Sequence, residues 1–239
     1  INDDVKKLSD LFWPGPMTII LKKKKDSKIC ELASAGLDTI GVRIPNNKTA
    51  LELIRSFKKP LAAPSANKST SLSSTEAKHV YEYFKKDKNL SIILDDGSAK
   101  IGLESTILHL INNEIHILRH GGISTEKIKE NFPNKIINDE QKKYKKIIAP
   151  GMLTKHYSPT VPLRINAKKA KKNELLIGFG PNYDSPNLSS KGDLTEAASN
   201  LFSFLAKYQK NYTKIAIAPI PNIGIGRAIN DRIKRASKD

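Results

Sequence analysis

The sequence is poor in cysteine and in long apolar runs, and each scarcity excludes a class of protein. Cys30 is the only cysteine among the 239 residues, so neither an intrachain disulfide nor a cysteine-rich zinc site can form. Nowhere do roughly 18 to 20 apolar residues follow one another, as a membrane span requires. The first residues show no basic segment followed by an apolar core. These absences favour a soluble protein of the reducing cytoplasm, with no membrane partner.

The common phosphate-binding and hydrolase signatures are also missing. No glycine-rich stretch ends in Gly-Lys-Ser or Gly-Lys-Thr, and no Gly-x-Gly-x-x-Gly follows a predicted strand. None of the five histidines is spaced with another ligand type as a metal site requires. No serine has a nucleophile-elbow context. Any nucleotide must be held by another scheme, and we expect neither a protein-held metal nor covalent hydrolysis.

Positive charge, in contrast, is abundant. Lysine and arginine number 41 against 24 acidic residues, which gives a formal net charge of +17. Clustered basic residues bind nucleic acid by releasing counterions from its phosphates. Here only seven of the basic residues are arginines, and the lysine runs at 22–25, 142–146 and 168–172 are more typical of solvated faces. A contact with tRNA or double-stranded RNA stays open, with weak support.

The first half of the chain predicts a mixed α/β domain. We expect a helix over 5–12, which ends at the break Trp13-Pro-Gly-Pro16. Another helix should run from the N-cap Asn47 to about Phe57, and a third over 75–84. Strands are expected at 17–21, 39–44, 61–63, 91–94, 105–110 and 114–119. The last two should form a hairpin around Asn112-Asn113.

The periodic pattern lapses between about 132 and 160, which predicts a linker or a functional loop. Beyond it, predicted strands at 161–165, 174–179 and 214–218 alternate with predicted helices at 194–208 and 226–236. This alternation is typical of a largely parallel sheet. We therefore predict a first domain over 1–131, a linker over 132–160 and a second, smaller domain over 161–239.

The stretch Leu61-Ala-Ala-Pro-Ser65-Ala-Asn67 combines an apolar segment with a rigid polar loop. Pro64 fixes one backbone angle, and its small neighbours let a ligand approach the main chain. A hydroxyl and a carboxamide two positions apart can face one pocket. Proline, serine and asparagine are also ordinary turn residues, so this segment alone favours a plain turn.

The stretch Thr39-Ile-Gly-Val-Arg43 is a second candidate. Alternation along a strand places Thr39, Gly41 and Arg43 on one face and the aliphatic residues on the other. A guanidinium beside a hydroxyl, with a glycine gap between them, suits a carboxylate or a phosphate. The alternative is a half-buried strand with a surface arginine, which these residues alone favour slightly.

Two further segments carry hydroxyls, glycines and an arginine. Gly102-Leu-Glu-Ser-Thr106 opens one strand of the predicted hairpin, and Arg119 ends the other just before His120-Gly-Gly122. A Gly-Gly step can bring backbone amides close to an anion, or it can be a plain turn. Asp95-Asp-Gly97 could bind a metal ion, but we favour a turn there.

Together these segments resemble the Sua5/YrdC family of threonylcarbamoyl-AMP synthases, in its two-domain Sua5 form. The resemblance follows the chain through Trp13-Pro-Gly-Pro-Met-Thr18, Thr39–Pro45, Ala63-Pro-Ser-Ala-Asn67, Gly102-Leu-Glu-Ser-Thr106, Leu118-Arg119, Pro150-Gly-Met152, His156-Tyr-Ser-Pro159, Gly178-Phe-Gly180, Gly192-Asp-Leu194 and Ile229-Asn-Asp-Arg232. Single pieces are weak, but this order across the whole chain is specific. It implies a twisted mixed-sheet, YrdC-like domain followed by a smaller Rossmann-like Sua5 domain.

The resemblance implies a reaction in which ATP, L-threonine and bicarbonate give threonylcarbamoyl-adenylate and pyrophosphate. This is the first step towards the threonylcarbamoyl modification of adenosine 37 in tRNA, so downstream threonylcarbamoyl-transfer proteins would be partners. Magnesium would arrive on the phosphates. The threonine site would consist of Arg43, Ser65 and Ser105. The ATP site would consist of Thr39, Asn67, Thr75, Arg119 and Tyr157.

The resemblance also gives the linker a role, because in the family it crosses the nucleotide pocket. Residues 150–159 would act as a lid that keeps water from a hydrolysable intermediate. Family members begin with Thr-Glu-Thr-Val-Tyr-Gly-type and Lys-x-Arg-type motifs, which this sequence does not contain, so we expect the first domain to be N-terminally incomplete.

Two other classes stay open. One is an RNA-binding module of the YrdC-like fold without catalysis, which the positive charge permits. The other is a nucleotide-binding or carbamoyl-transfer domain of a different pathway, against which the second-domain motifs argue.

Overall fold

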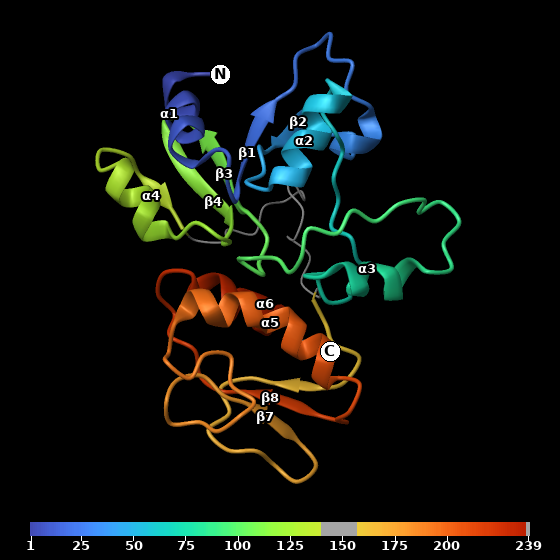
Figure 1. Ribbon diagram of the computed structural model, residues 1–239. Coiled ribbons are helices and arrows are strands. Elements are labelled where there is room, and N and C mark those ends of the chain that lie inside the picture. Colours follow the sequence, from blue (N-terminus) through green and yellow to red (C-terminus); the bar gives the residue numbers. More distant parts are fainter. Residues whose placement is uncertain (140–156, 238–239) are drawn as a thin grey trace. The chain divides into compact units, whose positions relative to one another are not determined.

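The computed structural model describes residues 1–139 and 157–237, which divide into two compact units (Figure 1). The first unit consists of Ile1–Ala63 with residues 104–139, and the second of Pro64–Leu103 with residues 157–237. The loop and helix between 64 and 103 therefore fold with the C-terminal part of the chain. The domain bounds derived from the sequence stay a prediction.

The first unit is built on a five-stranded mixed sheet. Its strands are β1 (Met17–Lys22), β2 (Thr39–Val42), β3 (Thr106–Ile111), β4 (Glu114–Arg119) and β5 (Ile137–Asn138), in the order β2-β1-β3-β4-β5. β1 is antiparallel to β2 and parallel to β3, whereas β4 is antiparallel to β3 and parallel to β5. Asn112 and Asn113 close the β3–β4 hairpin with φ angles of 49° and 66°, which asparagine tolerates in tight turns.

Two helices, α1 (Asp3–Phe12) and α4 (Thr125–Asn131), pack on one face of this sheet. Each begins with a side-chain cap: Asn2 accepts from the Val5 amide at 2.9 Å, and Ser124 accepts from the Lys127 amide at 3.2 Å. In Figure 1 both helices lie beside β3 and β4. Their apolar side chains form one core with those of β1, β3 and β4, consisting of Val5, Leu8, Phe12, Met17, Ile19, Leu108, Ile115, Ile117, Ile123, Ile128 and Phe132.

The remainder of the first unit is the short 3-10 helix η1 (Glu31–Ser34) and the helix α2 (Lys48–Phe57). α2 is capped by Asn47, whose side chain accepts from the Ala50 amide at 2.8 Å. No side chain of α2 is fully buried, and Phe57 is 53% exposed.

The second unit combines a small parallel sheet with three helices. β6 (Leu163–Arg164), β7 (Leu175–Ile177) and β8 (Ile215–Ile217) lie in the order β6-β8-β7. α5 (Leu194–Tyr208) and α6 (Gly226–Ala236) pack together beside this sheet (Figure 1), and α3 (Ala77–Phe84) belongs to the same unit. The core joins both long helices to the sheet and also takes in Leu72 and Tyr157.

The sequence predicts much of this correctly. The mixed α/β class is confirmed, and α5 and α6 have the predicted bounds. The strands predicted at 61–63 and 91–94 are wrong, because neither segment has regular secondary structure. Leu61 and Ile92 are instead exposed. An apolar run becomes a strand only when a neighbouring strand pairs with its backbone groups.

α4 is not predicted, because seven residues are too short for a clear helical period. Residues 150–156 of the predicted lid, with His156, lie outside the described residues. In the described parts of the chain, no helix is long and apolar enough to cross a membrane.

Candidate active site

The eight predicted ligand-binding residues divide between the two units. The first unit carries Thr39, Arg43, Ser105 and Arg119, and the second carries Ser65, Asn67, Thr75 and Tyr157. In each unit, folding brings together segments that are distant in the sequence.

The candidates of the first unit lie on the sheet face opposite the α1–α4 core. Met17 and Ile19 belong to that core, so Thr18 between them faces the other way. There the Oγ1 of Thr18 lies 2.7 Å from the Oγ of Ser105. The sequence prediction does not include Thr18, although the alternation along β1 and the motif Trp13-Pro-Gly-Pro-Met-Thr18 were signals that could have found it.

β2 continues this face. A Cβ added to Gly41 would lie 3.1 Å from the Cγ2 of Thr18, so Gly41 faces the same side. Thr39, two residues before, faces that side as well because strand residues alternate. Thr18 and Ile20 therefore lie close to Gly41 on this face, and the gap expected between the hydroxyl of Thr39 and the guanidinium of Arg43 stays a prediction.

Ser105 is held by Arg119. The arginine ends β4, is only 8% exposed, and donates through Nε and Nη2 to the carbonyl oxygen of Ser105 at 3.2 and 3.0 Å. Nη2 also donates to the Oγ of Ser105 at 3.2 Å. A planar guanidinium that binds both oxygens of one residue fixes the direction of its hydroxyl.

Arg43 follows β2, and the residue is exposed. Its Nε donates to the carbonyl oxygen of Gly15 at 3.0 Å, while the Gly15 amide donates to the carbonyl of Ile44 at 2.8 Å. The turn before β1 therefore anchors the arginine. Burial of the guanidinium lowers the pKa of Arg43 although the residue as a whole is exposed. A guanidinium held in place by a backbone bond suits a carboxylate ligand.

The two glycines after β4 allow their backbone to pack closely against the segment before β3. A Cβ on Gly121 would lie 2.3 Å from the carbonyl oxygen of Glu104 and 2.4 Å from the amide nitrogen of Thr106. The Gly122 amide donates to the same Glu104 carbonyl at 3.2 Å. The Gly-Gly step thus packs against the segment before β3, which favours the turn interpretation over an anion site.

In the second unit, Asn67 organises the loop that follows Pro64. Its Nδ2 donates to the carbonyl oxygens of Ser71 at 2.9 Å and Lys68 at 3.2 Å. Its Oδ1 is buried and has no hydrogen-bond partner among the described residues. A buried acceptor left unpaired costs about 1–3 kcal/mol, so a ligand that donates to this oxygen would be stabilised. Ser65, by contrast, is exposed.

Thr75 is buried just before α3, and its Oγ1 also has no partner within the described ranges. Its amide donates to the Nδ1 of His79 at 3.4 Å. Burial is the main cause of a lowered pKa at His79; Glu76 opposes the shift, whereas Lys78 and Lys210 add to it. His79 is therefore neutral near pH 7, as an acceptor nitrogen must be.

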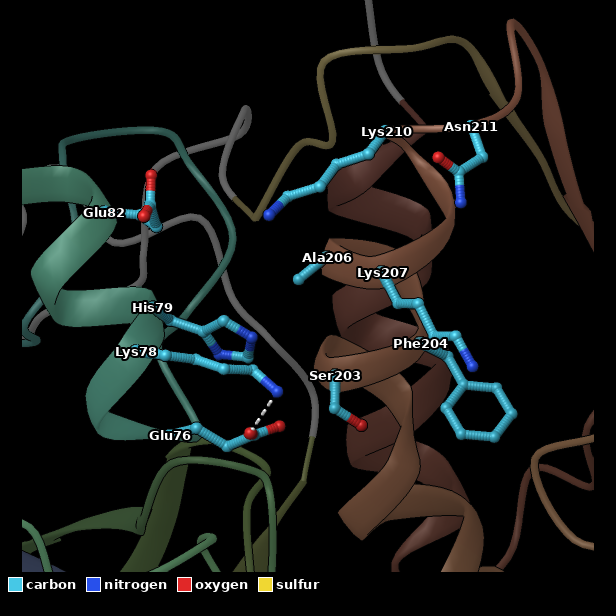
Figure 2. A pocket seen from close by; sticks show the side chains of 10 residues that line it. All are labelled: Glu76, Lys78, His79, Glu82, Ser203, Phe204, Ala206, Lys207, Lys210 and Asn211. Carbon is cyan, nitrogen blue, oxygen red and sulfur yellow. Dashed lines mark ion pairs between the residues drawn. The ribbon is translucent and has the colours of Figure 1, made fainter.

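A cleft of about 470 Å³ lies beside His79, between α3 and α5 of the second unit (Figure 2). Lys78 and Glu76, paired at 2.6 Å, line it from one side, and Phe204 and Lys207 line it from the other. None of the eight predicted residues is among those that line it. The cleft and the predicted site are therefore distinct.

Tyr157 is buried in the core of the second unit and is only 1% exposed. Its ring centroid lies 5.6 Å from that of Phe202 and 5.0 Å from the Cζ of Arg232. The next residue, Ser158, donates its amide to the carbonyl of Thr70 at 2.9 Å. The backbone next to Tyr157 is therefore paired with the loop that carries Asn67, and Tyr157 shares a core with Leu72 of that loop. Its predicted contact with ATP stays a prediction.

Asp95 and Gly97 form the predicted turn. The Asp95 carboxylate accepts from the Gly97 amide at 2.9 Å, and Gly97 has a φ of 79°. Among the described residues, no group of three or more histidine, cysteine, aspartate and glutamate side chains could hold a metal ion.

Comparison with known proteins covers nearly the whole chain. Residues 1–121 match the Sua5, YciO and YrdC family, described as "Telomere recombination", and residues 123–238 match "Threonylcarbamoyl-AMP synthase, C-terminal domain". These two matches define a two-domain α/β protein. The chain belongs to the Sua5/YrdC family, and it has the C-terminal domain of the two-domain members.

Relatives and a solved structure agree with this assignment. Threonylcarbamoyl-AMP synthase of Pyrococcus abyssi is 32% identical over 99% of this chain and 74% of its own length. The Bacillus subtilis protein of that name is 33% identical over 98% of this chain and 73% of its own length. The crystal structure of P. abyssi Sua5 complexed with L-threonine covers 99% of this chain and 74% of that chain, with a TM-score of 0.86 at 31% identity. The expected YrdC-like fold with a Sua5 domain is confirmed.

Proposed function

We propose that this chain is a threonylcarbamoyl-AMP synthase, which makes threonylcarbamoyl-adenylate and pyrophosphate from L-threonine, bicarbonate and ATP. The observation that carries the proposal is the match over 99% of the chain to a structure that contains L-threonine. Relatives of that name align over the same span. The RNA-binding alternative gains no support from these comparisons.

The proposed chemistry has two steps. The amine of threonine first condenses with bicarbonate to a carbamate, with loss of water. A carbamate oxygen then attacks the α-phosphorus of ATP, so one phosphorus–oxygen bond forms while the bond to the β-phosphate breaks and pyrophosphate leaves. No covalent enzyme intermediate is needed, so positioning and electrostatic stabilisation supply the rate enhancement.

In this proposal, L-threonine is bound by Arg43, Ser65 and Ser105. The guanidinium of Arg43 would bind the carboxylate, because its planar donors match the two oxygens. Ser105, oriented by Arg119 and 2.7 Å from Thr18, would bind a polar group of the amino acid. Ser65 would complete the site from the loop after Pro64.

ATP would be bound by Thr39, Asn67, Thr75, Arg119 and Tyr157. The buried and unpaired Oδ1 of Asn67 and Oγ1 of Thr75 support this, because a nucleotide offers donors in its amino group and its ribose hydroxyls. Magnesium would enter with the phosphates of ATP as part of the substrate. We place the reaction in the cytoplasm, upstream of proteins that transfer the threonylcarbamoyl group to tRNA.

Pyrophosphate release tests the proposal. The purified protein should release pyrophosphate from ATP only when L-threonine and bicarbonate are both present, and L-serine should substitute poorly. Pyrophosphate release that does not depend on threonine would indicate a different nucleotide-dependent reaction. Salt-sensitive tRNA binding without any threonine-dependent release would favour the RNA-binding module instead.

A further inference from the structure

Arg232 is an arginine buried completely in an apolar core. It lies in α6 with an exposed fraction of 0%, in the same core region as Tyr157 and Phe202. Burying a charged side chain is costly unless it is paired, and a well-packed apolar residue at such a position is often at least as stabilising. The position therefore calls for an explanation other than stability.

The guanidinium is held in one orientation by its own helix. Its Nη1 donates to Oδ2 of Asp231 at 2.6 Å, while Oδ1 of the same carboxylate accepts from the Nε of Arg235 at 2.9 Å. Asp231 is thereby fixed from both of its oxygens. The Cζ of Arg232 then lies 5.0 Å from the ring centroid of Tyr157, within the range of a cation–π contact.

Tyr157 itself has a backbone that needs support. Its φ of 65° is in the left-handed region, which costs a residue with a side chain roughly 1–2 kcal/mol. Such a conformation persists where the surroundings fix it. Arg232 and Phe202, whose ring centroid lies 5.6 Å from that of Tyr157, supply those surroundings.

Fixing Tyr157 also fixes the loop of the proposed nucleotide site. Ser158 pairs in parallel with Ser71 and donates its amide to the Thr70 carbonyl at 2.9 Å. The Ser71 carbonyl in turn accepts from the Nδ2 of Asn67 at 2.9 Å. One continuous set of contacts within the second unit therefore leads from Arg232 to the side chain of Asn67.

We infer that Arg232 is a positioning residue for nucleotide binding: through Tyr157 and the Ser158–Ser71 pairing, it holds Asn67 with its unpaired Oδ1 turned towards the ligand. The inference rests on the proposed function, because it assigns Asn67 to ATP. The inference predicts different effects on the binding of the two substrates. Loss of the Arg232–Tyr157 contact should weaken ATP binding more than threonine binding, since two of the three proposed threonine residues, Arg43 and Ser105, belong to the other unit and only Ser65 lies in this one.

A double-mutant cycle on the intact protein tests the inference, with the Kd of ATP and the KM of each substrate as readouts. Arg232→Lys keeps the charge but loses the planar group over the ring, and Tyr157→Leu removes the ring. Each should raise the Kd of ATP about three- to tenfold, with the KM of threonine within about twofold of wild type. The double variant should be no weaker than the more affected single variant, because both remove the same contact.

Arg164→Lys is the matched control. Arg164 is also paired with a carboxylate in the second unit, with its Nη2 2.5 Å from Oε2 of Glu174, but it lies on β6 rather than in this set of contacts. It should leave the Kd of ATP unchanged. If Arg232→Lys does not fold, Asp231→Asn weakens the same arginine's support with a smaller change in shape and should raise the Kd of ATP in the same direction.

Three results would overturn the inference. One is strictly additive effects of Arg232→Lys and Tyr157→Leu, and another is an equal loss of threonine and ATP binding. The third is a lowered melting temperature with an unchanged Kd of ATP, which would make Arg232 a core residue only. A wild-type protein that binds no ATP would instead overturn the proposed function, and the inference with it.

Discussion

The Oγ1 of Thr18, in β1, lies 2.7 Å from the Oγ of Ser105, which comes directly before the parallel neighbouring strand β3. Arg119 fixes Ser105 from the other side, with Nη2 3.2 Å from the same oxygen. Two residues 87 positions apart in the sequence thus form a hydrogen-bonded pair of hydroxyls on the sheet face opposite the core. This pair gives the first unit a polar site of fixed geometry.

Ser105→Ala should weaken threonine binding, because it removes the hydroxyl that Thr18 and Arg119 orient. The KM of threonine should rise about tenfold, which corresponds to one lost hydrogen bond of ~1.4 kcal/mol. Ser9→Ala, at an exposed hydroxyl of α1 in the same unit, is the matched control and should change nothing. An unchanged KM for threonine in Ser105→Ala would exclude Ser105 from the threonine site.

Arg43→Ala should weaken threonine binding more than ATP binding. Hydrogen bonds to charged groups contribute about 1.5–3 kcal/mol each, so the KM of threonine should rise at least tenfold. Arg55→Ala, in α2 of the same unit, removes a surface arginine as a control for net charge. Equal losses for the two substrates would show that Arg43 does not bind the threonine carboxylate.

Gly121→Ala should destabilise the first unit, since the new Cβ would lie 2.3 Å from the Glu104 carbonyl. The backbone on both sides cannot move aside as a flexible side chain does. We therefore expect the free energy of unfolding, measured in urea, to fall by about 3 kcal/mol. Gly41→Ala is the comparison. Its Cβ would meet the end of the Thr18 side chain at 3.1 Å, so it should cost little stability but crowd the candidate site. Equal stability of the two variants would contradict this packing.

Stability should fall as the pH drops below 6.5. Burial, and then the neighbouring His116, lower the pKa of His109 from 6.5, and the two histidines lie opposite each other on β3 and β4. The unfolded chain therefore takes up this proton at a higher pH than the folded protein does. Stability is unaffected above that pH and decreases through the window between 6.5 and the lowered folded pKa.

Urea unfolding at pH about 7.5 and about 5.5 measures this loss. His109→Gln, which removes the partly buried titrating group, should lose less stability between the two conditions than the wild type does. His79, whose pKa burial also lowers, should account for part of the remaining loss. The same loss in His109→Gln as in the wild type would exclude His109 as a source of the pH dependence.

Local sequence patterns predict the helices and strands of this fold well where the secondary structure of a residue depends mainly on its neighbours in the sequence. The apolar face of α5 and the cap at Asp193, which accepts from the amides of Thr195 and Glu196, are visible in the sequence. The segments around Leu61 and Ile92 show the limit. Their strand-like composition is a local property, whereas strand pairing depends on a partner elsewhere in the chain.

The candidate site was predictable in part for the same reason. Alternation along β2 correctly groups Thr39 with Gly41, and the family resemblance supplies the remaining candidates. The pairing of Thr18 with Ser105 depends on the parallel register of β1 and β3, which no local pattern reveals. Likewise, the contact of Arg232 with Tyr157 joins residues 75 positions apart in the sequence, so only the fold shows it.

The most direct test of the proposed function is detection of the product itself. The protein is incubated with ATP, L-threonine and ¹³C-labelled bicarbonate, and the nucleotides are analysed by mass spectrometry. The account predicts a threonylcarbamoyl-adenylate that carries the ¹³C label, formed in step with pyrophosphate and lost when threonine is omitted. Hydrolysis of ATP with no labelled adenylate, in a protein shown to be folded and to bind both ATP and threonine, would contradict it.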